Sequence, residues 1–219
     1  DVTSASLAIL CRKILQKSRK PQCIKQRPII KSMIDYRRKT VIKGQQELRC
    51  GYTTGTCAAA AAKAAAVTLL SGEICRDVSL QLPGGEHIIL ETEFLECSEN
   101  CVKCGMIKDA GDDPDITNGL LICAAVEKTE GETILIDGGM GVGRVTKPGL
   151  DQPVGAAAIN SVPRKMIHEA VEDVRRQYAW EKGLKVTVFI PMGRKRQKNT
   201  ESDAWHCRGA FCAWNNRYC

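Results

Sequence analysis

A nearly uninterrupted run of alanines, within GYTTGTCAAAAAKAAA at residues 51–66, is the feature that most constrains the fold of this chain. Alanine has the highest helix propensity, so we predict a helix from Thr56 to Ser71, with Gly72 as its left-handed stop. Such small side chains let a neighbouring backbone or ligand come close to the helix. The threonines before the run place hydroxyls beside the free N–H groups of the first turn, at the positive end of the helix dipole, which predicts an anion site.

The positive net charge of the whole chain suggests a nucleic-acid partner, but the distribution of the charge along the chain does not support one. The 219 residues carry a formal charge of +7, but residues 33–192 hold 18 Lys and Arg against 22 Asp and Glu. This acidic middle has neither gathered cations nor aromatic stacking surfaces for nucleic acid, and no apolar run is long enough to span a bilayer. Twelve cysteines, several inside apolar runs, fit a reducing compartment. We expect a cytoplasmic protein that binds neither nucleic acid nor membrane.

Two pairs of extended segments and two helices, all predicted from sequence, indicate the fold class. Residues 78–82 and 87–94 flank a Pro-Gly-Gly turn and predict a hairpin, and residues 120–127 and 132–137 predict a second pair. Hairpins that pack with two helices predict an α+β domain rather than a doubly wound sheet.

The second helix is predicted to begin at Pro163 and to be closed by Gly183, before a strand at residues 184–190. Its apolar face, at helical spacing, consists of Met166, Ile167, Ala170, Val171, Val174 and Tyr178.

A glycine-rich segment, ILIDGGMGVGRVTK at residues 134–147, follows a predicted strand. A dinucleotide-binding turn needs a helix directly after the glycines, but Arg144 to Lys147 reads as extended and Pro148 ends it. We interpret the segment as a backbone loop lying against a flat or anionic ligand, with Arg144 and Lys147 supplying charge. The alternative is a loop whose glycines serve only its turns.

Three cysteines, Cys97, Cys101 and Cys104, have the C-x3-C-x2-C spacing that holds an iron-sulfur cluster in radical enzymes that use S-adenosylmethionine. Those enzymes place a Gly-Gly-Glu segment downstream, whereas here it lies upstream at residues 84–86, and no alternating series of strands and helices follows. Free thiols in a loop are the favoured interpretation, with a cluster or structural zinc as alternatives.

The segment DAGDDPDITNG, residues 109–119, carries four carboxylates close together. It lacks the alternating ligands and the closing glutamate of a calcium loop. Mutual repulsion of neighbouring carboxylates can raise one pKa into the range of a general base. A solvated acidic turn is the alternative.

Four segments together resemble a known family: LRCGYTTGTCAAAAAKAA (48–65), KDAGDDPDITNG (108–119), GVGRVTKPGL (141–150) and AAINSVPR (157–164). In this order they are similar to the motifs of the CbiD family, the cobalt-precorrin-5B C1-methyltransferases of anaerobic cobalamin biosynthesis. The resemblance extends from Met33 to Pro191. It departs from the family pattern at Asn118, at Ala156 with Ala157 and at Ser161, where that pattern has His, Glu-Pro and Pro.

The resemblance also divides the chain. Residues 33–192 are expected to form a CbiD-like N-terminal domain, and residues 1–32 a non-native or disordered basic arm, with Met33 the natural start. The family continues into a second, α/β domain, which we expect to be missing here. Codons for residues 194–219, read one nucleotide later, permit a glycine-rich continuation similar to the family's, so residues 193–219 are expected to be a frame-shifted, unstructured tail.

The resemblance implies transfer of a methyl group from S-adenosylmethionine to C1 of cobalt-precorrin-5B, giving cobalt-precorrin-6A. This substrate is a large disc rimmed with carboxylates, so we expect distributed anion-binding groups rather than one deep pocket. Asp112 or Asp113 is assigned the catalytic role, as a base or by shaping the local electrostatics. The expected substrate-binding residues are Thr53, Thr54, Gly55, Thr56, Asp109, Asp115, Thr117, Gly141, Gly143, Arg144, Thr146, Lys147, Asn160 and Arg164.

No resident metal is expected, and the missing domain is expected to supply much of the S-adenosylmethionine site. The competing hypotheses are a truncated, non-catalytic domain that still binds corrinoid, and a radical iron-sulfur enzyme using the three cysteines.

Overall fold

The computed structural model describes residues 39–149 and 151–191, so the expected arm at 1–32 and tail at 193–219 lie outside the described residues. Its elements are, in chain order, β1 (Thr40–Lys43), β2 (Gln46–Arg49), α2 (Thr54–Ser71), β3 (Asp77–Gln81), β4 (His87–Glu91), β5 (Phe94–Cys97), β6 (Cys101–Ile107), β7 (Leu121–Thr129), β8 (Ile134–Gly138), α3 (Ser161–Gln177) and β9 (Gly183–Phe189). Neither helix in the described ranges has the length and hydropathy of a membrane-spanning segment.

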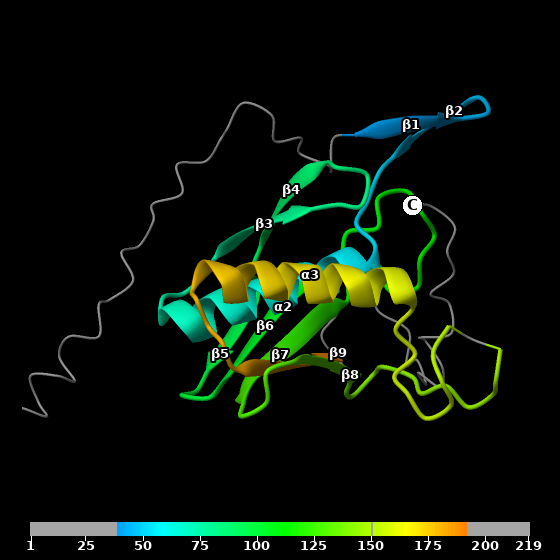
Figure 1. Cartoon of the computed structure of the whole chain (residues 1–219). Coiled ribbons are helices and arrows are strands. Elements are labelled where there is room, and N and C mark those ends of the chain that lie inside the picture. Colours follow the sequence, from blue (N-terminus) through cyan, green and yellow to red (C-terminus); the bar gives the residue numbers. More distant parts are fainter. Residues whose placement is uncertain (1–38, 150, 192–219) are drawn as a thin grey trace, which may run out of the picture.

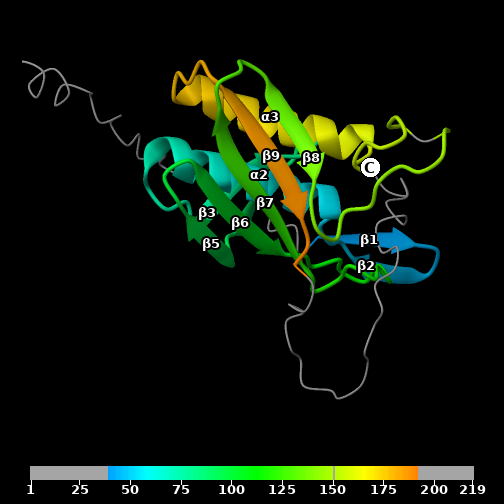
Figure 2. The ribbon, with the colours of Figure 1, turned by 90° about the horizontal axis from the view of Figure 1, so that it is seen from below.

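A five-stranded sheet with two helices on one face forms the body of the molecule (Figures 1 and 2). Its strand order is β5-β6-β7-β9-β8, and all neighbours are antiparallel except β8 and β9. Two separate hairpins, β1–β2 and β3–β4, complete the fold. The fold is therefore mixed, with helices and mainly antiparallel strands, as the predicted class requires.

The prediction that the segments at residues 120–127 and 132–137 pair with each other was wrong. Strands β7 and β8 exist, but β9 lies between them and bonds to both, antiparallel to β7 and parallel to β8. The connection from β8 to β9 runs through α3, because parallel neighbours need a crossover rather than a tight turn. The first predicted hairpin is confirmed as β3–β4.

The alanine helix, α2, is the centre of the core. Its residues from Thr54 to Ala62 are all buried, because α3, the sheet and the β3–β4 hairpin approach it from different sides. Such close approach requires side chains no larger than a methyl group at most positions. Gly72 adopts φ +75° and its N–H bonds to the carbonyl of Thr68, which confirms the predicted stop.

The predicted apolar face of α3 is confirmed, since the first five of its six residues are buried and Tyr178 is partly buried. The predicted end at Gly183 was wrong: α3 ends at Gln177, and Gly183 is the first residue of β9. A Cβ at Gly183 would lie 2.6 Å from the carbonyl oxygen of Thr133, so this glycine permits close packing of the turn.

Candidate functional site

One end of the sheet gathers the segments that carry the predicted site residues. Both helices begin there: a Cβ at Gly55, in the first turn of α2, would lie 3.0 Å from the side chain of Pro163 in the first turn of α3. The loop from β6 to β7, residues 108–120, and the glycine segment after β8 lie at the same end (Figure 2). The two helices are parallel, so the positive ends of their dipoles face the same region.

The acidic loop is attached to the end of β2 and to the segment between β2 and α2. The N–H of Tyr52 donates to the carbonyl of Asp109 at 2.6 Å, and the N–H of Asp112 donates to the carbonyl of Arg49 at 3.1 Å. In return, the N–H of Arg49 donates to Oδ2 of Asp112 at 2.7 Å. These three bonds fix where the loop leaves β6.

Side-chain contacts tighten the same junction. Asp109 receives two hydrogen bonds from the Arg49 guanidinium, at 2.8 and 2.9 Å. The pKa of Arg49 is raised by its hydrogen bond to Asp109. A Cβ at Gly51 would lie 1.9 Å from the carbonyl carbon of Ala110, so the two backbones touch. Asn118, which stands at a departure from the family pattern, accepts from the N–H of Ala110 at 3.0 Å.

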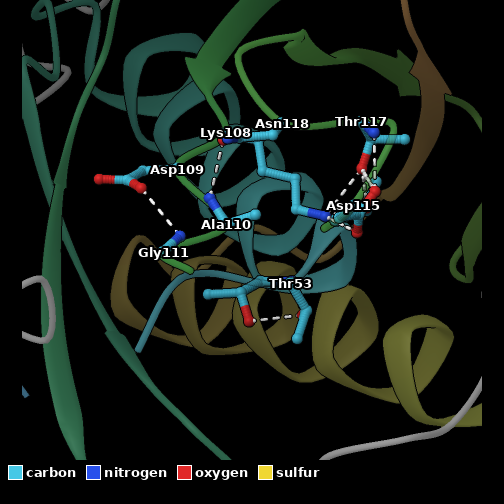
Figure 3. Close-up of polar contacts among 10 residues, drawn as sticks. Thr53, Lys108, Asp109, Ala110, Gly111, Asp115, Thr117 and Asn118 are labelled. Carbon is cyan, nitrogen blue, oxygen red and sulfur yellow. Dashed lines mark hydrogen bonds and ion pairs between the residues drawn. The ribbon is translucent and has the colours of Figure 1, made fainter. Parts of the chain in front are cut away.

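A buried lysine connects this loop to the start of α2 (Figure 3). The ammonium of Lys108 donates to Thr117 Oγ1 at 2.7 Å, to Thr54 Oγ1 at 3.2 Å and to Oδ2 of Asp115. Three predicted binding residues thus meet, but their polar atoms bond to one another inside the protein. Lys108 itself was missed, although it stands directly before the acidic motif.

The two candidate catalytic carboxylates lie on the exposed part of the loop. One oxygen of Asp112 is held by the N–H of Arg49, whereas the side chain of Asp113 has no hydrogen-bond partner among the residues that the structure describes. Both carboxylates are accessible to a ligand.

The threonines at the start of α2 differ in exposure. Thr53 is the N-cap: its Oγ1 accepts from the N–H of Thr56 at 3.1 Å and shares a hydrogen bond with the Thr56 hydroxyl at 2.9 Å. Thr54 and Thr56 are buried, and Gly55 packs against α3. Thr53 is therefore the one of these four that faces solvent.

The glycine segment continues into an extended chain, because Arg144 forms an isolated β-bridge with Ala157. No helix opens on the glycines, which confirms the rejection of a dinucleotide fold. Gly141 has φ +78°, and a Cβ there would lie 2.7 Å from the Ile190 carbonyl oxygen, so it packs against the protein. The exposed predicted residues of this segment are Gly141, Gly143, Arg144, Thr146 and Lys147.

The two cations of this segment have different surroundings. Arg144 forms two hydrogen bonds with Asp137, at 2.6 and 3.0 Å, and one with the Gly138 carbonyl at 2.7 Å. The hydrogen bond from Arg144 lowers the pKa of Asp137 below its usual value. Lys147 is exposed and has no ion-pair partner within the described ranges.

The start of α3 borders an open hollow of about 370 Å³. Arg164 lies in its wall and donates to the Ile136 carbonyl at 2.8 Å. Asn160 is the N-cap of α3, and Oδ2 of Asp151 accepts from the N–H of Ser161 at 3.3 Å and from its hydroxyl at 2.8 Å. The hollow combines apolar strand residues with cations.

The three spaced cysteines lie on strands, not in the predicted loop. Cys101 and Cys104 are three positions apart on β6, so they point to opposite faces of the sheet. Cys104 shares its face with Val102, which pairs with Cys97 on β5. Burial raises the pKa of the Cys104 thiol to about 12, which disfavours the thiolate that a metal requires. No group of three metal-binding side chains occurs in the part of the chain that the structure describes.

Comparisons with known proteins agree on one family. The CbiD family model matches residues 41–206. A protein named cobalt-precorrin-5B C(1)-methyltransferase from Priestia megaterium is 48% identical over 162 residues, which cover 74% of this chain and 44% of the relative. A protein of the same name from Thermoanaerobacter sp. (strain X514) is 49% identical over 154 residues, covering 70% of this chain and 41% of the relative.

A solved structure agrees with these relatives. The crystal structure of the cobalamin biosynthesis protein cbiD from Archaeoglobus fulgidus matches with a TM-score of 0.50 and 28% identity, covering 70% of this chain and 48% of that chain. The chain spans less than half the length of each of these relatives.

Proposed function

This chain belongs to the CbiD family, and we propose that it serves in methyl transfer from S-adenosylmethionine to C1 of cobalt-precorrin-5B, giving cobalt-precorrin-6A. The observation that carries the proposal is the gathering of cations, exposed carboxylates and two helix starts at one end of the sheet. The relatives' names support methylation of cobalt-precorrin-5B at C1, and the charges at this end of the molecule suit both that substrate and a sulfonium donor.

The cations complement the corrinoid. Its peripheral carboxylates need several anion-binding groups spread over a wide surface, and Lys147, Arg144 and Arg164 supply them from two segments. Thr53 adds an exposed hydroxyl where the dipole of α2 is positive. The site binds by distributed contacts rather than by enclosure.

The carboxylates complement the methyl donor. When bound, the donor supplies an electrophilic methyl group on a positively charged sulfur. Asp112 and Asp113 are exposed and negatively charged, so their charge fits such a sulfonium. In the transfer, ring carbon C1 forms a bond to the methyl carbon as the carbon–sulfur bond breaks, and its electron pair leaves with sulfur. Asp112 or Asp113 acts as the base in this step or shapes the electrostatics near the reacting carbon.

The reaction can be tested directly with a labelled methyl donor. The chain is incubated anaerobically with cobalt-precorrin-5B and S-adenosylmethionine, and the corrinoid product is separated and weighed by mass spectrometry. The expected product has gained one labelled methyl group. Loss of label transfer in a matched reaction with the heated protein is the control.

A second candidate function is corrinoid binding without catalysis, because the exposed cations Arg144 and Lys147 can bind carboxylates whether or not a methyl group is transferred. The same reaction separates the two. A change in corrinoid absorbance on adding the chain, with no methyl transfer, supports the second candidate. No absorbance change and no transfer contradicts both.

Substitution of Lys147 tests the binding surface. We expect Lys147→Ala to weaken corrinoid binding several-fold at low salt, because one exposed cation is lost from a charged surface. Stability should not change. The matched control is Lys182→Ala, a lysine paired with Glu130 before β9, at the opposite end of the sheet. Equal affinity of the two variants at low salt would contradict the assignment.

A further inference from the structure

Lys108 is a buried cation inside the candidate site. Its side chain is 2% exposed, and lysine is almost never so buried unless its charge is paired. Neither the corrinoid surface nor the carboxylates of the proposed function assign it a role. Its position, at the junction of β6 and the acidic loop, sets what that role can be.

All the donors of the Lys108 ammonium are occupied. An ammonium group has three N–H donors, and the three partners are Thr54 Oγ1, Thr117 Oγ1 and Asp115 Oδ2. Lys108 therefore has no donor left for a substrate. Its effect on the reaction must act through the groups that it holds.

Those groups form a closed network. The second oxygen of Asp115, Oδ1, accepts from the N–H of Thr117 at 2.7 Å and from its hydroxyl at 2.6 Å. The hydroxyls of Thr117 and Thr54 lie 3.2 Å apart. The network thus joins the end of β6, the far side of the acidic loop and the first turn of α2 (Figure 3).

The candidate catalytic residues lie between the two ends of this network. Asp112 and Asp113 fall in the sequence between Lys108 and Asp115, so the loop that carries them is closed by the ion pair. We propose that Lys108 is a positioning residue, which fixes the exposed carboxylates of this loop relative to the first turn of α2. This inference rests on the proposed function for the role of those carboxylates. A displacement of about 1 Å in a reacting group can lower a rate by 10²-fold.

The first test is Lys108→Met, which keeps the length of the side chain and removes the ammonium. We expect kcat for methyl transfer to fall by about tenfold or more, with KM for the corrinoid within about twofold of the original chain. The matched control is Lys103→Met, also on β6, where the lysine pairs with the exposed Glu96 and should leave both constants unchanged. A rise in KM with an unchanged kcat would overturn the proposal.

A double variant separates positioning from simple stabilisation. Lys108→Met leaves Asp115 half-buried without its cation, and Lys108→Met with Asp115→Asn removes that carboxylate charge as well. We expect the thermal midpoint to recover in the double variant while kcat stays low. Recovery of kcat together with the midpoint would show that Lys108 only prevents an unpaired charge, and would overturn the proposal.

A measurement independent of activity separates this inference from the proposed function. Amide hydrogen exchange of residues 109–118 should be at least about tenfold faster in Lys108→Met, while exchange in the centre of β7 stays the same. If Lys108→Met does not fold, Thr54→Val removes one partner and should give the same change to a smaller degree. Unchanged exchange in the loop overturns the inference. Absent methyl transfer and binding in the original chain contradict only the proposed function.

Discussion

Two cation–carboxylate pairs stand at the same end of the molecule and differ in burial. Lys108 is 2% exposed against 30% for Asp115, whereas Arg144 and Asp137 are 45% and 47% exposed. Water screens the exposed pair, so its partners can be exchanged at little free-energy difference. Breaking a buried pair leaves a charge without water or counter-ion. We therefore expect the buried pair to hold the acidic loop in place, and the exposed pair to leave Arg144 able to exchange Asp137 for another carboxylate.

The largest expected effect tests the buried side of this comparison. Lys108→Met should lower the free energy of unfolding by about 3 kcal/mol, because Asp115 loses its cation and two threonine hydroxyls lose a donor. Urea denaturation of the variant and of Lys103→Met measures the difference. A loss no greater than that of Lys103→Met would mean that burial does not distinguish the two kinds of pair.

The next effect concerns the backbone contact that supports the buried pair. Gly51→Ala should lower the free energy of unfolding by about 1–3 kcal/mol, since its Cβ would lie 1.9 Å from the Ala110 carbonyl carbon and the loop must move. Gly84→Ala is the matched control, because nothing lies within 4 Å of a Cβ at that position. Urea midpoints of the two variants that coincide would contradict the close contact.

Acid should lower the stability contributed by Asp115 more than the stability contributed by Asp137. Burial alone would raise the pKa of Asp115, but hydrogen bonds from Lys108 and Thr117 outweigh it and hold the pKa below the ordinary value of 3.8. A carboxyl whose pKa is lowered by folding contributes stability above its unfolded pKa, and this contribution is lost as the pH falls through the folded pKa. We expect Asp115→Asn to flatten the acid dependence of the urea midpoint more than Asp137→Asn does.

A larger flattening of the acid dependence by Asp137→Asn than by Asp115→Asn would contradict this expectation. The pKa of Asp137 is also lowered, by its hydrogen bond with Arg144, but the exposed pair is screened by water. Both variants are measured at the same ionic strength, so that screening is equal.

The smallest expected effect tests the exposed side. Asp137→Asn removes the charge that competes for Arg144, so corrinoid binding should tighten by a few-fold at low salt and converge with the original chain at high salt. The amide oxygen can still accept from the N–H of Gly138, at 2.8 Å in the original chain. Absorbance titration gives both affinities. Weaker binding would mean that Asp137 holds Arg144 in its binding geometry.

Elements whose geometry is set by residues close together in the sequence were predictable. The stop at Gly72, the β3–β4 turn and the apolar face of α3 follow from conformations and periods that a few adjacent residues set. Strand order was not predictable in the same way. Placing β9 between β7 and β8 depends on pairings between distant residues, so a turn between two strands was mistaken for a sign that they pair.

The site followed the same rule. The segments that carry the candidate residues were predicted from sequence, and the structure brings them together at one end of the sheet. The burial of Lys108 could not be predicted, because its partner Thr54 lies 54 residues earlier and meets it only in the folded chain. The hydrogen bond that Thr117 forms with Thr54 could not be predicted for the same reason.

The insertion of β9 also affects the order in which the domain can fold. β7 and β8 leave the ribosome first, but neither can complete its pairing on that side until β9 arrives after α3. Their unpaired edges are available to other chains during this interval. Non-local pairing of this kind slows folding relative to hairpins such as β3–β4. The nascent domain therefore depends on residues 183–189 for protection of these edges against aggregation.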